Sequence, residues 1–411
     1  MIEFFKFRGV ITHINQLFSK FKSKDHLIIA LMICSIWMSY RLTSEPVRDG
    51  DIFRHKVVGA AILENKTFAV NDVINSQLFP LMNLWTVAIN RMIPGDTTLN
   101  RTAFLVYLLS ILLFSKILSF YNKSEGAEHN HLWTLSLLAC HPIVVNSGST
   151  YGDYIYSLFL ILVSWYLVLH RFPGLAGLFI AIASGMRITN AIWVIPFFIL
   201  FCNNKNYRHA TSFVVTAIIG GYLVWLGTFI ANGTLNPLVV FDWSKGLATT
   251  NFNPTITKGL QVMINRTTHF IGISVILYCL IFFKHIDLDK WIARIKQQQE
   301  LLAAVVVVLI VFTILGDKQE YMITLAPVFA LLLPSFKRKS LNRGLCVVVF
   351  SMNIVFINFL NSHPTKIYIS NGYWSQSMAV SACGDWLKLK FNIPNGEFAP
   401  IDGDANFVCR Q

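Results

Sequence analysis

Apolar runs of about 15 to 20 residues recur along nearly the whole chain, and a helix of that length can cross a bilayer. Of the 411 residues, 54% are hydrophobic and only 13% are charged, and the mean hydropathy is +0.54. A soluble domain does not tolerate such a composition. The sequence therefore predicts an all-α fold, a polytopic transmembrane helical bundle.

The apolar runs predict about eleven spans. Their expected ranges are 25–41, 102–120, 133–148, 154–170, 174–187, 189–203, 211–231, 268–284, 301–316, 320–334 and 342–361. His141-Pro142 inside one span indicates a kink with a buried imidazole. Segment 76–93 is also apolar but carries Asn83, Asn90 and Arg91, so we expect it to be an interfacial helix of the first outer loop.

The short connections between the predicted spans alternate in charge. Four segments expected on one side are rich in Lys and Arg: the N-terminal segment, 203–209, 284–300 and 335–343. The connection 149–153 has no Lys or Arg, and 316–321 has one. The positive-inside rule places the N-terminus in the cytoplasm, and an odd number of spans then places the C-terminal tail outside. The net charge of +13 reflects basic loops facing anionic lipid and sites for anionic substrates, not nucleic-acid binding.

Two cysteines lie in the predicted outer tail, Cys383 and Cys409. An oxidising compartment would allow them to form a disulfide, and the loop of about 26 residues that it closes corresponds to roughly 3 kcal/mol in the chain-entropy model. The remaining cysteines occur singly in spans and are expected to pack as apolar residues: Cys34, Cys140, Cys202, Cys279 and Cys346.

This topology collects ionisable residues at one face of the membrane: Asp49, Asp51, Asp153, Arg187, Lys318 and Glu320. Ionisable groups at membrane depth are costly without a use, so the set predicts an active site at the outer leaflet. For any one of these residues, the capping of a helix end in water is an adequate alternative.

The segment Gly174–Cys202 is apolar apart from a few residues around Arg187 at its middle. As one helix it would be roughly 43 Å long, which exceeds the hydrocarbon core of about 30 Å. We therefore expect two short helices with Arg187 at their outer corner. Snorkelling of the side chain to the interface is the alternative explanation for an arginine there.

Three patterns stand in order on the predicted outer side. They are an acidic loop that leads into a small-residue helix (49–54 and 58–65), a short helix pair with a basic corner (174–177 and 185–190), and a late acidic-basic corner (317–321, running on to 326–327). Together they resemble the GT-C superfamily of membrane glycosyltransferases, whose members take sugars from polyprenyl-phosphate carriers. The first pattern reads Asp-Gly-Asp, whereas many members have Asp-Glu. The resemblance implies a GT-C-like transmembrane catalytic domain over 1–361, with its first outer loop at 42–101, and a short extracytoplasmic tail over 362–411.

The resemblance also implies roles for the acidic and basic side chains. Asp51 is the first candidate for a general base toward the acceptor hydroxyl, and Asp49 is the second. The two carboxylates could instead share Mg²⁺ or Mn²⁺. Arg187 is expected to bind the leaving phosphate, with Arg54 and Lys318 as further cations, because the planar guanidinium suits phosphate oxygens.

Two further residues, Asp153 and Glu320, are expected to orient the acceptor or a cation, although helix capping explains each equally well. The resulting hypothesis is a hexosyl- or pentosyltransferase at the periplasmic face of a bacterial inner membrane. Its donor would be a polyprenyl-phosphate sugar, and its acceptor a glycan or glycolipid of a cell-surface polysaccharide, such as a lipid-linked O-antigen.

Two alternatives to this function stay open. One is a glycan polymerase or ligase that uses a diphosphate-linked oligosaccharide. The other is a transporter or lipid flippase, which predicts inverted repeats and charges at mid-bilayer. The sequence shows no clear repeat, and its charges fall at one face.

Overall fold

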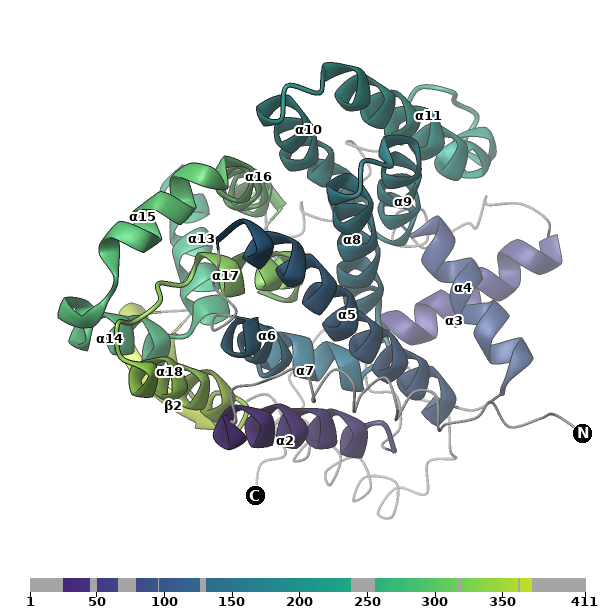
Figure 1. Cartoon of the computed structure of the whole chain (residues 1–411). Coiled ribbons are helices and arrows are strands. Elements are labelled where there is room, and N and C mark those ends of the chain that lie inside the picture. Colours follow the sequence, from purple (N-terminus) through teal and green to yellow (C-terminus); the bar gives the residue numbers. More distant parts are fainter. Residues whose placement is uncertain are drawn as a thin grey trace, which may run out of the picture.

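The computed structural model describes residues 25–44, 50–65, 79–94, 96–125, 131–237, 256–315, 319–360 and 363–371. Within these residues most helices lie side by side in one bundle (Figure 1). The first half comprises α2 (His26–Leu42), α3 (Gly50–Asn65), α4 (Pro80–Met92), α5 (Asp96–Glu125), α6 (His131–Ala139), α7 (Pro142–Ser149), α8 (Asp153–Leu169), α9 (Pro173–Met186), η3 (Ile188–Trp193), α10 (Val194–Asn203) and α11 (Tyr207–Ala231). The second half comprises α13 (Ile256–Ile271), α14 (Ile273–Ile281), η4 (Phe283–His285), α15 (Leu288–Gln297), α16 (Gln299–Leu315), η5 (Gln319–Leu325), α17 (Ala326–Leu332), α18 (Lys339–Ser351), and strands β1 (Val355–Leu360) and β2 (His363–Asn371).

Two helices of the described chain are long and apolar enough to cross a membrane, Thr97–Tyr121 and Tyr207–Ala231. The number rises to four if the bent pairs α7–α8 and α13–α14 each count as one span. Shorter apolar helices accompany them, among them α2, α9 and α16. The chain is thus a helical integral membrane protein, and the expected number of about eleven spans stays a prediction.

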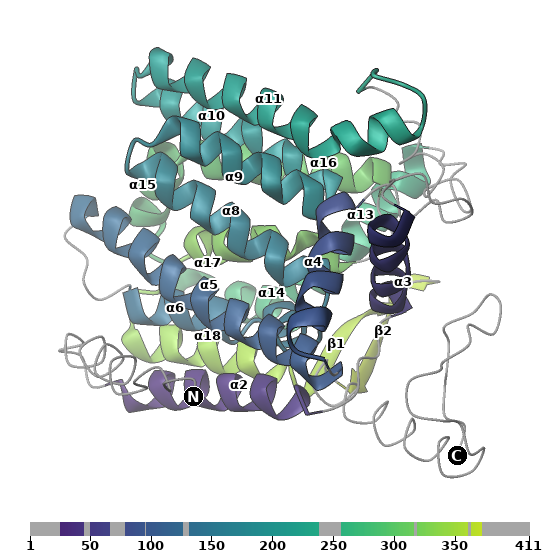
Figure 2. The same ribbon diagram turned by 90° about the vertical axis from the view of Figure 1, so that its right-hand side faces the viewer.

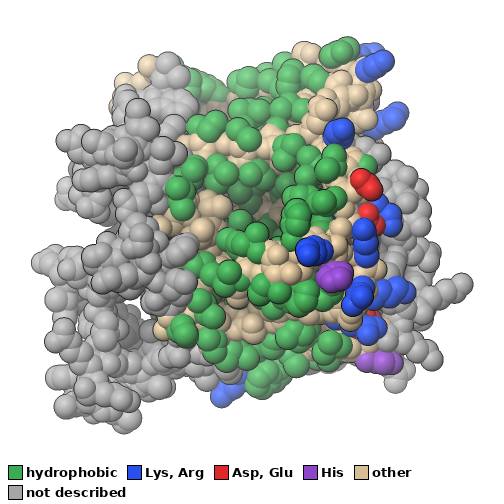
Figure 3. All heavy atoms as spheres, turned by 90° about the vertical axis from the view of Figure 1, so that its left-hand side faces the viewer, with side chains coloured by type: hydrophobic (Ala, Val, Ile, Leu, Met, Phe, Trp, Pro, Cys, Tyr) green, Lys and Arg blue, Asp and Glu red, His purple; other side chains and the backbone are tan. Residues whose placement is uncertain are grey.

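The two ends of the bundle differ in what they carry. At one end α3, α4 and the β1–β2 sheet lie across the helix ends (Figure 2), and we call this the α3–α4 end. The opposite end, which we call the basic end, holds α15 and the connection between α10 and α11. Figure 3 shows Lys and Arg side chains gathered along one edge of a broad hydrophobic face. This division agrees with the alternation of basic and non-basic connections in the sequence.

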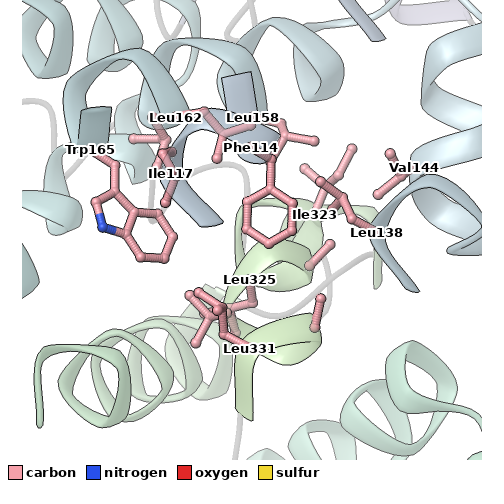
Figure 4. Close-up of a cluster of buried hydrophobic side chains, with 14 of the residues drawn as sticks. Phe114, Ile117, Leu138, Val144, Leu158, Leu162, Trp165, Ile323, Leu325 and Leu331 are labelled. Carbon is pink, nitrogen blue, oxygen red and sulfur yellow. The ribbon is translucent and has the colours of Figure 1, made fainter. Parts of the chain in front are cut away.

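The interior between α5, α8, η5 and α17 is filled by large apolar side chains (Figure 4). Phe114 and Ile117 of α5 meet Leu158 and Leu162 of α8, and Leu331 of α17 approaches from the other side. In a bilayer the lipid tails are as apolar as these side chains. Close packing and dispersion, more than exclusion of water, therefore stabilise the contacts between the helices.

The predicted kink at His141-Pro142 is confirmed as a complete helix break between α6 and α7. Proline has no N–H to donate, and the side-chain amide of Asn353 donates to the carbonyl of Cys140 at 2.9 Å, which satisfies one of the freed backbone groups. A second break divides α13 from α14 at Gly272, which has a φ of +83° and lies at a bend of 71°. The expected span 268–284 therefore contains a helix break, and the helix that enters it, α13, begins earlier, at Ile256.

The predicted span 342–361 is wrong in its second half. Helix α18 ends at Ser351, and Val355–Leu360 forms β1, which pairs antiparallel with β2 in the register Val355↔Asn371 and Ile357↔Ile369. A short apolar run rich in β-branched residues fits a strand as well as a helix, and hydropathy alone does not separate the two. The fold thus contains a two-stranded sheet beside its helices, and the boundary expected at 361–362 falls between the two strands.

The helix predicted within 76–93 is present as α4 over Pro80–Met92, and α3 packs directly against it. The close approach occurs at Gly59, where any Cβ would run into the backbone carbonyl of Asn83 and the side chain of Val87. Glycine alone permits this distance between the two helix backbones. Helices α3 and α4 are therefore fixed against each other at the α3–α4 end of the bundle.

Candidate active site at the corner of α8 and α9

The site begins with the way in which α9 ends. Arg187 follows the last residue of α9 with an extended backbone (φ −157°, ψ 123°), so the helix stops there and η3 starts one residue later. The side-chain amide of Asn190 donates to the carbonyl of Ala183 at 2.9 Å and to the hydroxyl of Ser157 at 2.8 Å. These bonds satisfy a carbonyl at the helix end and attach the corner to α8. The predicted pair of short helices with Arg187 at the corner is confirmed.

The guanidinium of Arg187 is held inside the protein by Asp153, the first residue of α8. Nη1 of Arg187 donates to Oδ2 of Asp153 at 2.6 Å, and the side chains of the two residues are only 9% and 7% exposed. The carbon Cζ of Arg187 lies 4.7 Å from the ring centre of Tyr154 and 5.6 Å from that of Phe79. The cation is thus balanced by a carboxylate and faced by two aromatic rings, which offsets the cost of removing it from water.

A layer of hydroxyl groups fixes the chain just before Asp153. The backbone N–H of Tyr151 donates to Oδ1 of Asn100 at 2.9 Å, and its phenol is 3.0 Å from the hydroxyl of Thr86. The phenol of Tyr156 is 2.8 Å from the hydroxyl of Thr102. Burial raises the pKa of the Tyr151 phenol, so this group stays a neutral hydrogen-bonding hydroxyl. Helices α4, α5 and α8 are thereby joined around the residue that pairs with Arg187.

Helix α3 supplies a residue that sequence reasoning missed. His55 is buried, and its Nδ1 lies 2.6 Å from Oδ1 of Asn83 on α4. The imidazole also meets the ring of Phe79 edge-on, with 5.4 Å between the ring centres. His55 stands four residues after Asp51, within the helix that follows the acidic loop. That spacing places both residues on one side of a helix and could have drawn attention to the histidine.

The segment that carries Glu320 also reaches this corner. The indole N–H of Trp193, at the end of η3, donates to the hydroxyl of Thr324 at 3.1 Å. The element η5 packs against α8 as well. The element η5 is therefore tied to α8 and to the end of η3.

The predicted site residues differ in how far the structure describes them. Arg187 and Asp153 are brought into direct contact, and Gly152 rather than Asp153 takes the N-cap position of α8. Asp51 and Arg54 lie on α3, and Glu320 lies in η5. The structure describes the backbone of these three residues but not their side chains. Four predicted residues lie outside the described residues altogether: Asp49, Lys318, Cys383 and Cys409.

The burial of Arg187 differs from the expectation of a guanidinium at the headgroup layer. With 7% of the residue exposed, the side chain points into the bundle toward Asp153. The reason is that the carboxylate and the aromatic rings of Tyr154 and Phe79 offer the cation a better environment than the apolar surface around the corner does.

The predicted metal ligands, Asp49 and Asp51, belong to the acidic loop and the start of α3. Among the described residues no three His, Cys, Asp or Glu side chains gather as a metal site would require. The carboxylates of Asp49 and Asp51 are outside that description, so the expectation of Mg²⁺ or Mn²⁺ stays a prediction.

Comparison with known proteins gives one informative likeness. No protein-family model matches the sequence, and no curated protein matches it. The structure is similar to the crystal structure of ArnT from Cupriavidus metallidurans bound to undecaprenyl phosphate, with a TM-score of 0.54 and 12% sequence identity. This likeness shows that the chain shares the fold of ArnT. The match covers 90% of this chain and 66% of the ArnT chain, so this chain spans about two thirds of the length of ArnT. The resemblance stated from the three sequence patterns is thus confirmed at the level of the fold.

Proposed function

We propose that this protein is a glycosyltransferase that moves a sugar from a polyprenyl-phosphate carrier to an acceptor outside the cytoplasm. The observation that carries the proposal is the buried ion pair of Arg187 and Asp153 at the α3–α4 end of a GT-C fold. The ArnT structure with undecaprenyl phosphate bound supports a carrier of this chemical class. A buried cation with an assigned partner suits a phosphate that must be held at one place and in one orientation.

Arg187 is the candidate for the phosphate. Its guanidinium is planar and has five N–H donors, of which Nη1 is directed at Asp153. Asp153 therefore fixes the orientation of the fork at the corner, where the proposal places the lipid phosphate. As the sugar leaves, negative charge grows on the lipid phosphate, and a pre-oriented guanidinium stabilises that state more than the ground state. Arg54 and Lys318 are the further cations of the proposal.

The acceptor hydroxyl must lose a proton as it attacks. In this proposal the base that takes the proton lies on α3 or in the loop before it. Asp51 is the first candidate and Asp49 the second, with a shared Mg²⁺ or Mn²⁺ as the alternative use of the pair. What supports this location is the contact of α3 with the corner, since His55 of α3 and Arg187 approach the same ring of Phe79. Glu320 and Asp153 would orient the acceptor or a cation at the site.

The acceptor of the proposal is a glycan or glycolipid of a cell-surface polysaccharide, such as a lipid-linked O-antigen. The setting is the periplasmic face of a bacterial inner membrane. The sidedness is supported by the basic end of the bundle lying opposite the α3–α4 end.

The test is a donor assay with the purified full-length protein in lipid nanodiscs. A panel of polyprenyl-phosphate sugars is supplied with a glycolipid acceptor, and the appearance of sugar-free polyprenyl phosphate is measured. We expect at least one donor to be consumed, and Asp51→Asn to reduce turnover by about 10²–10⁴-fold. Release from a diphosphate-linked oligosaccharide only would favour a polymerase or ligase. Consumption of no donor, or activity within about threefold of wild type in both Asp51→Asn and Asp49→Asn, would contradict the proposal.

A further inference from the structure

Two histidines of the described chain are hydrogen-bonded to asparagine side chains, and the two bonds are opposite in direction. In α3, Nδ1 of His55 lies 2.6 Å from Oδ1 of Asn83, and because a carbonyl oxygen only accepts, Nδ1 carries the hydrogen. At the basic end, Nδ2 of Asn206 lies 2.7 Å from Nδ1 of His209, so there Nδ1 accepts. A neutral imidazole with its hydrogen on Nδ1 keeps a lone pair on Nε2. His55 is therefore held in the tautomer that can receive a proton at Nε2.

The position of His55 is fixed by its surroundings. Gly59, one turn further along α3, lets the two helix backbones approach until a Cβ would strike the carbonyl of Asn83. Phe79 stands just before α4 and meets the imidazole edge-on. A group held by packing on two sides and by a short hydrogen bond needs little reorganisation before it reacts.

The same phenylalanine connects His55 to the proposed phosphate site. The ring centre of Phe79 is 5.4 Å from that of His55 and 5.6 Å from Cζ of Arg187. The imidazole and the guanidinium thus both contact the same aromatic ring. In a transfer reaction the base and the phosphate ligand must stand on opposite sides of the anomeric carbon, with the reacting atoms about 3–3.5 Å apart. His55 and Arg187 meet at one ring from two different elements, which places a candidate base and a candidate phosphate ligand near each other.

We propose that His55 is the general base of the transfer reaction and that Asn83 is its positioning residue. This inference rests on the proposed function. The O–H bond of the acceptor breaks and its proton passes to Nε2 of His55, while the oxygen's electron pair forms the bond to the anomeric carbon. The bond from that carbon to the lipid phosphate oxygen breaks, and its electron pair leaves with the phosphate. The imidazolium then returns its proton to water, and Asn83 accepts from Nδ1–H in both charge states.

Asp51 takes a different role in this scheme. It lies one helical turn before His55 on α3, and a carboxylate at that spacing stabilises an imidazolium by its charge. Loss of Asp51 lowers turnover whether it is the base or the partner of the base, so mutation of Asp51 alone does not separate the two schemes. The pH dependence does. The charged residues on the elements around His55 are Asp51, Arg54, Lys56 and Glu64 of α3, Arg91 of α4, and the Arg187–Asp153 pair beyond Phe79.

The physical distinction lies in where the two kinds of base titrate. An imidazole ordinarily titrates near neutral pH, whereas a carboxylate in an outer loop does so about 2.5 units lower. A histidine base therefore predicts that kcat/KM falls at a higher pH than it would with an aspartate base. Catalysis is also most effective when the base titrates close to the working pH.

The experiment measures kcat, KM and the pH dependence of kcat/KM for donor consumption in nanodiscs. We expect His55→Gln to lower kcat by about 10²–10⁴-fold, to leave KM for the donor within about threefold, and to lose the fall near neutral pH. Added imidazole should restore part of the activity of His55→Ala and none of that of Asp51→Asn. The control His209→Gln removes the second of the two asparagine-bonded histidines, at the basic end, and should leave the profile unchanged.

Asn83 provides a second and independent readout. In Asn83→Asp a carboxylate replaces the amide oxygen beside Nδ1 and favours the charged imidazolium, so the fall in kcat/KM should move to higher pH. In Asn83→Leu the tautomer is no longer fixed, and kcat should fall while KM changes little. A merely structural role of the pair would alter stability without moving the pH profile.

The possible failures are distinguishable. If wild type consumes polyprenyl-phosphate sugars while His55→Gln keeps both its rate and its pH profile, the inference is wrong and the proposed function stands. A wild-type fall only at the lower pH expected of an aspartate base, together with an absence of imidazole rescue, also overturns the role of His55 alone. If wild type consumes no such donor, both the proposed function and the role of His55 are overturned.

Discussion

Two ion pairs of equal length lie at opposite ends of this bundle. Arg187 and Asp153 join α9 to α8 at 2.6 Å, and Arg343 and Asp25 join α18 to the start of α2 at the same distance. The side chains of the first pair are 9% and 7% exposed, whereas the arginine of the second is 45% exposed. Both pairs connect helices, but only the first is enclosed by aromatic rings within the described residues.

The comparison shows that distance alone does not tell what an ion pair does. In the buried pair, removal of either partner leaves the other as an uncompensated charge, which typically costs about 3–5 kcal/mol. The pair at the basic end remains in contact with solvent, where such contacts are worth about 0–1 kcal/mol and are screened by salt. In the proposed function the first pair positions the phosphate ligand, whereas the second ties two helices together.

The largest effect is expected from breaking the buried pair. Arg187→Ala strands Asp153 and removes the proposed phosphate ligand, so we expect the unfolding free energy to fall by about 3–5 kcal/mol and turnover to fall by roughly 10²–10³-fold. Thermal unfolding in micelles and the donor assay measure the two effects separately. Normal turnover in Arg187→Ala would remove the phosphate role, even if stability fell as expected.

Reversal of the pair sharpens the distinction between holding the corner and serving the reaction. The double variant Asp153→Arg with Arg187→Asp should be more stable than either single variant, because the charges can pair again. Its turnover should remain as low as that of Arg187→Ala, since a carboxylate now occupies the position of the cation. If the double variant were active, the orientation of the guanidinium would not matter.

A smaller loss is expected from Arg187→Lys. The charge survives, but the planar fork and its fit to a phosphate are lost, so turnover should recover to about tenfold above Arg187→Ala while remaining below wild type. The measurement is kcat for the same donor in both variants. A lysine variant equal to wild type would show that a point charge is sufficient.

The pair at the basic end should respond weakly. Arg343→Ala is expected to lower stability by at most about 1 kcal/mol, with a difference that shrinks as salt is added, and to leave turnover unchanged. Thermal unfolding at low and high ionic strength tests this. A loss as large as that in Arg187→Ala would break the contrast between the two ends.

The smallest effect concerns Asp287, also at the basic end. A hydrogen bond from Lys290, at 3.0 Å, lowers the pKa of this half-buried carboxyl below its ordinary value of 3.8. A lowered folded-state pKa means that the contribution to stability is present above pH 3.8 and is lost as the pH falls through the folded-state value. Lys290→Ala should therefore differ slightly from wild type at neutral pH and converge with it in acid, as measured by unfolding across that range.

The corner at Arg187 could be predicted because the apolar segment around it is longer than one membrane span. A single helix over Gly174–Cys202 is too long for a bilayer, so a break near its polar middle was the simplest solution, and α9 does end at Met186. The partner of Arg187 could not be found in that way. Asp153 is 34 residues away, and only the antiparallel packing of α8 on α9 brings the two together.

The sequence was less informative where short-range patterns are ambiguous. Hydropathy did not separate strand β1 from a continuation of α18, and it did not reveal that α13 begins at Ile256. His55 was overlooked because its partner Asn83 belongs to another helix, 28 residues further along. The contact between the two depends on the close approach at Gly59, which composition alone does not show.

The placement of the buried pair on consecutive helices has a consequence for biogenesis. Asp153 opens α8 and Arg187 follows α9, and the two helices are joined by the short connection 170–172. A lone charge is costly to transfer into a bilayer, by about 2.5–3.5 kcal/mol at a helix centre. Helices α8 and α9 emerge from the ribosome one after the other, so they can enter the membrane as a hairpin. The opposite charges at its two open ends then neutralise each other. The charges of the mature corner would then accompany one another from synthesis onward, and neither would cross the bilayer alone.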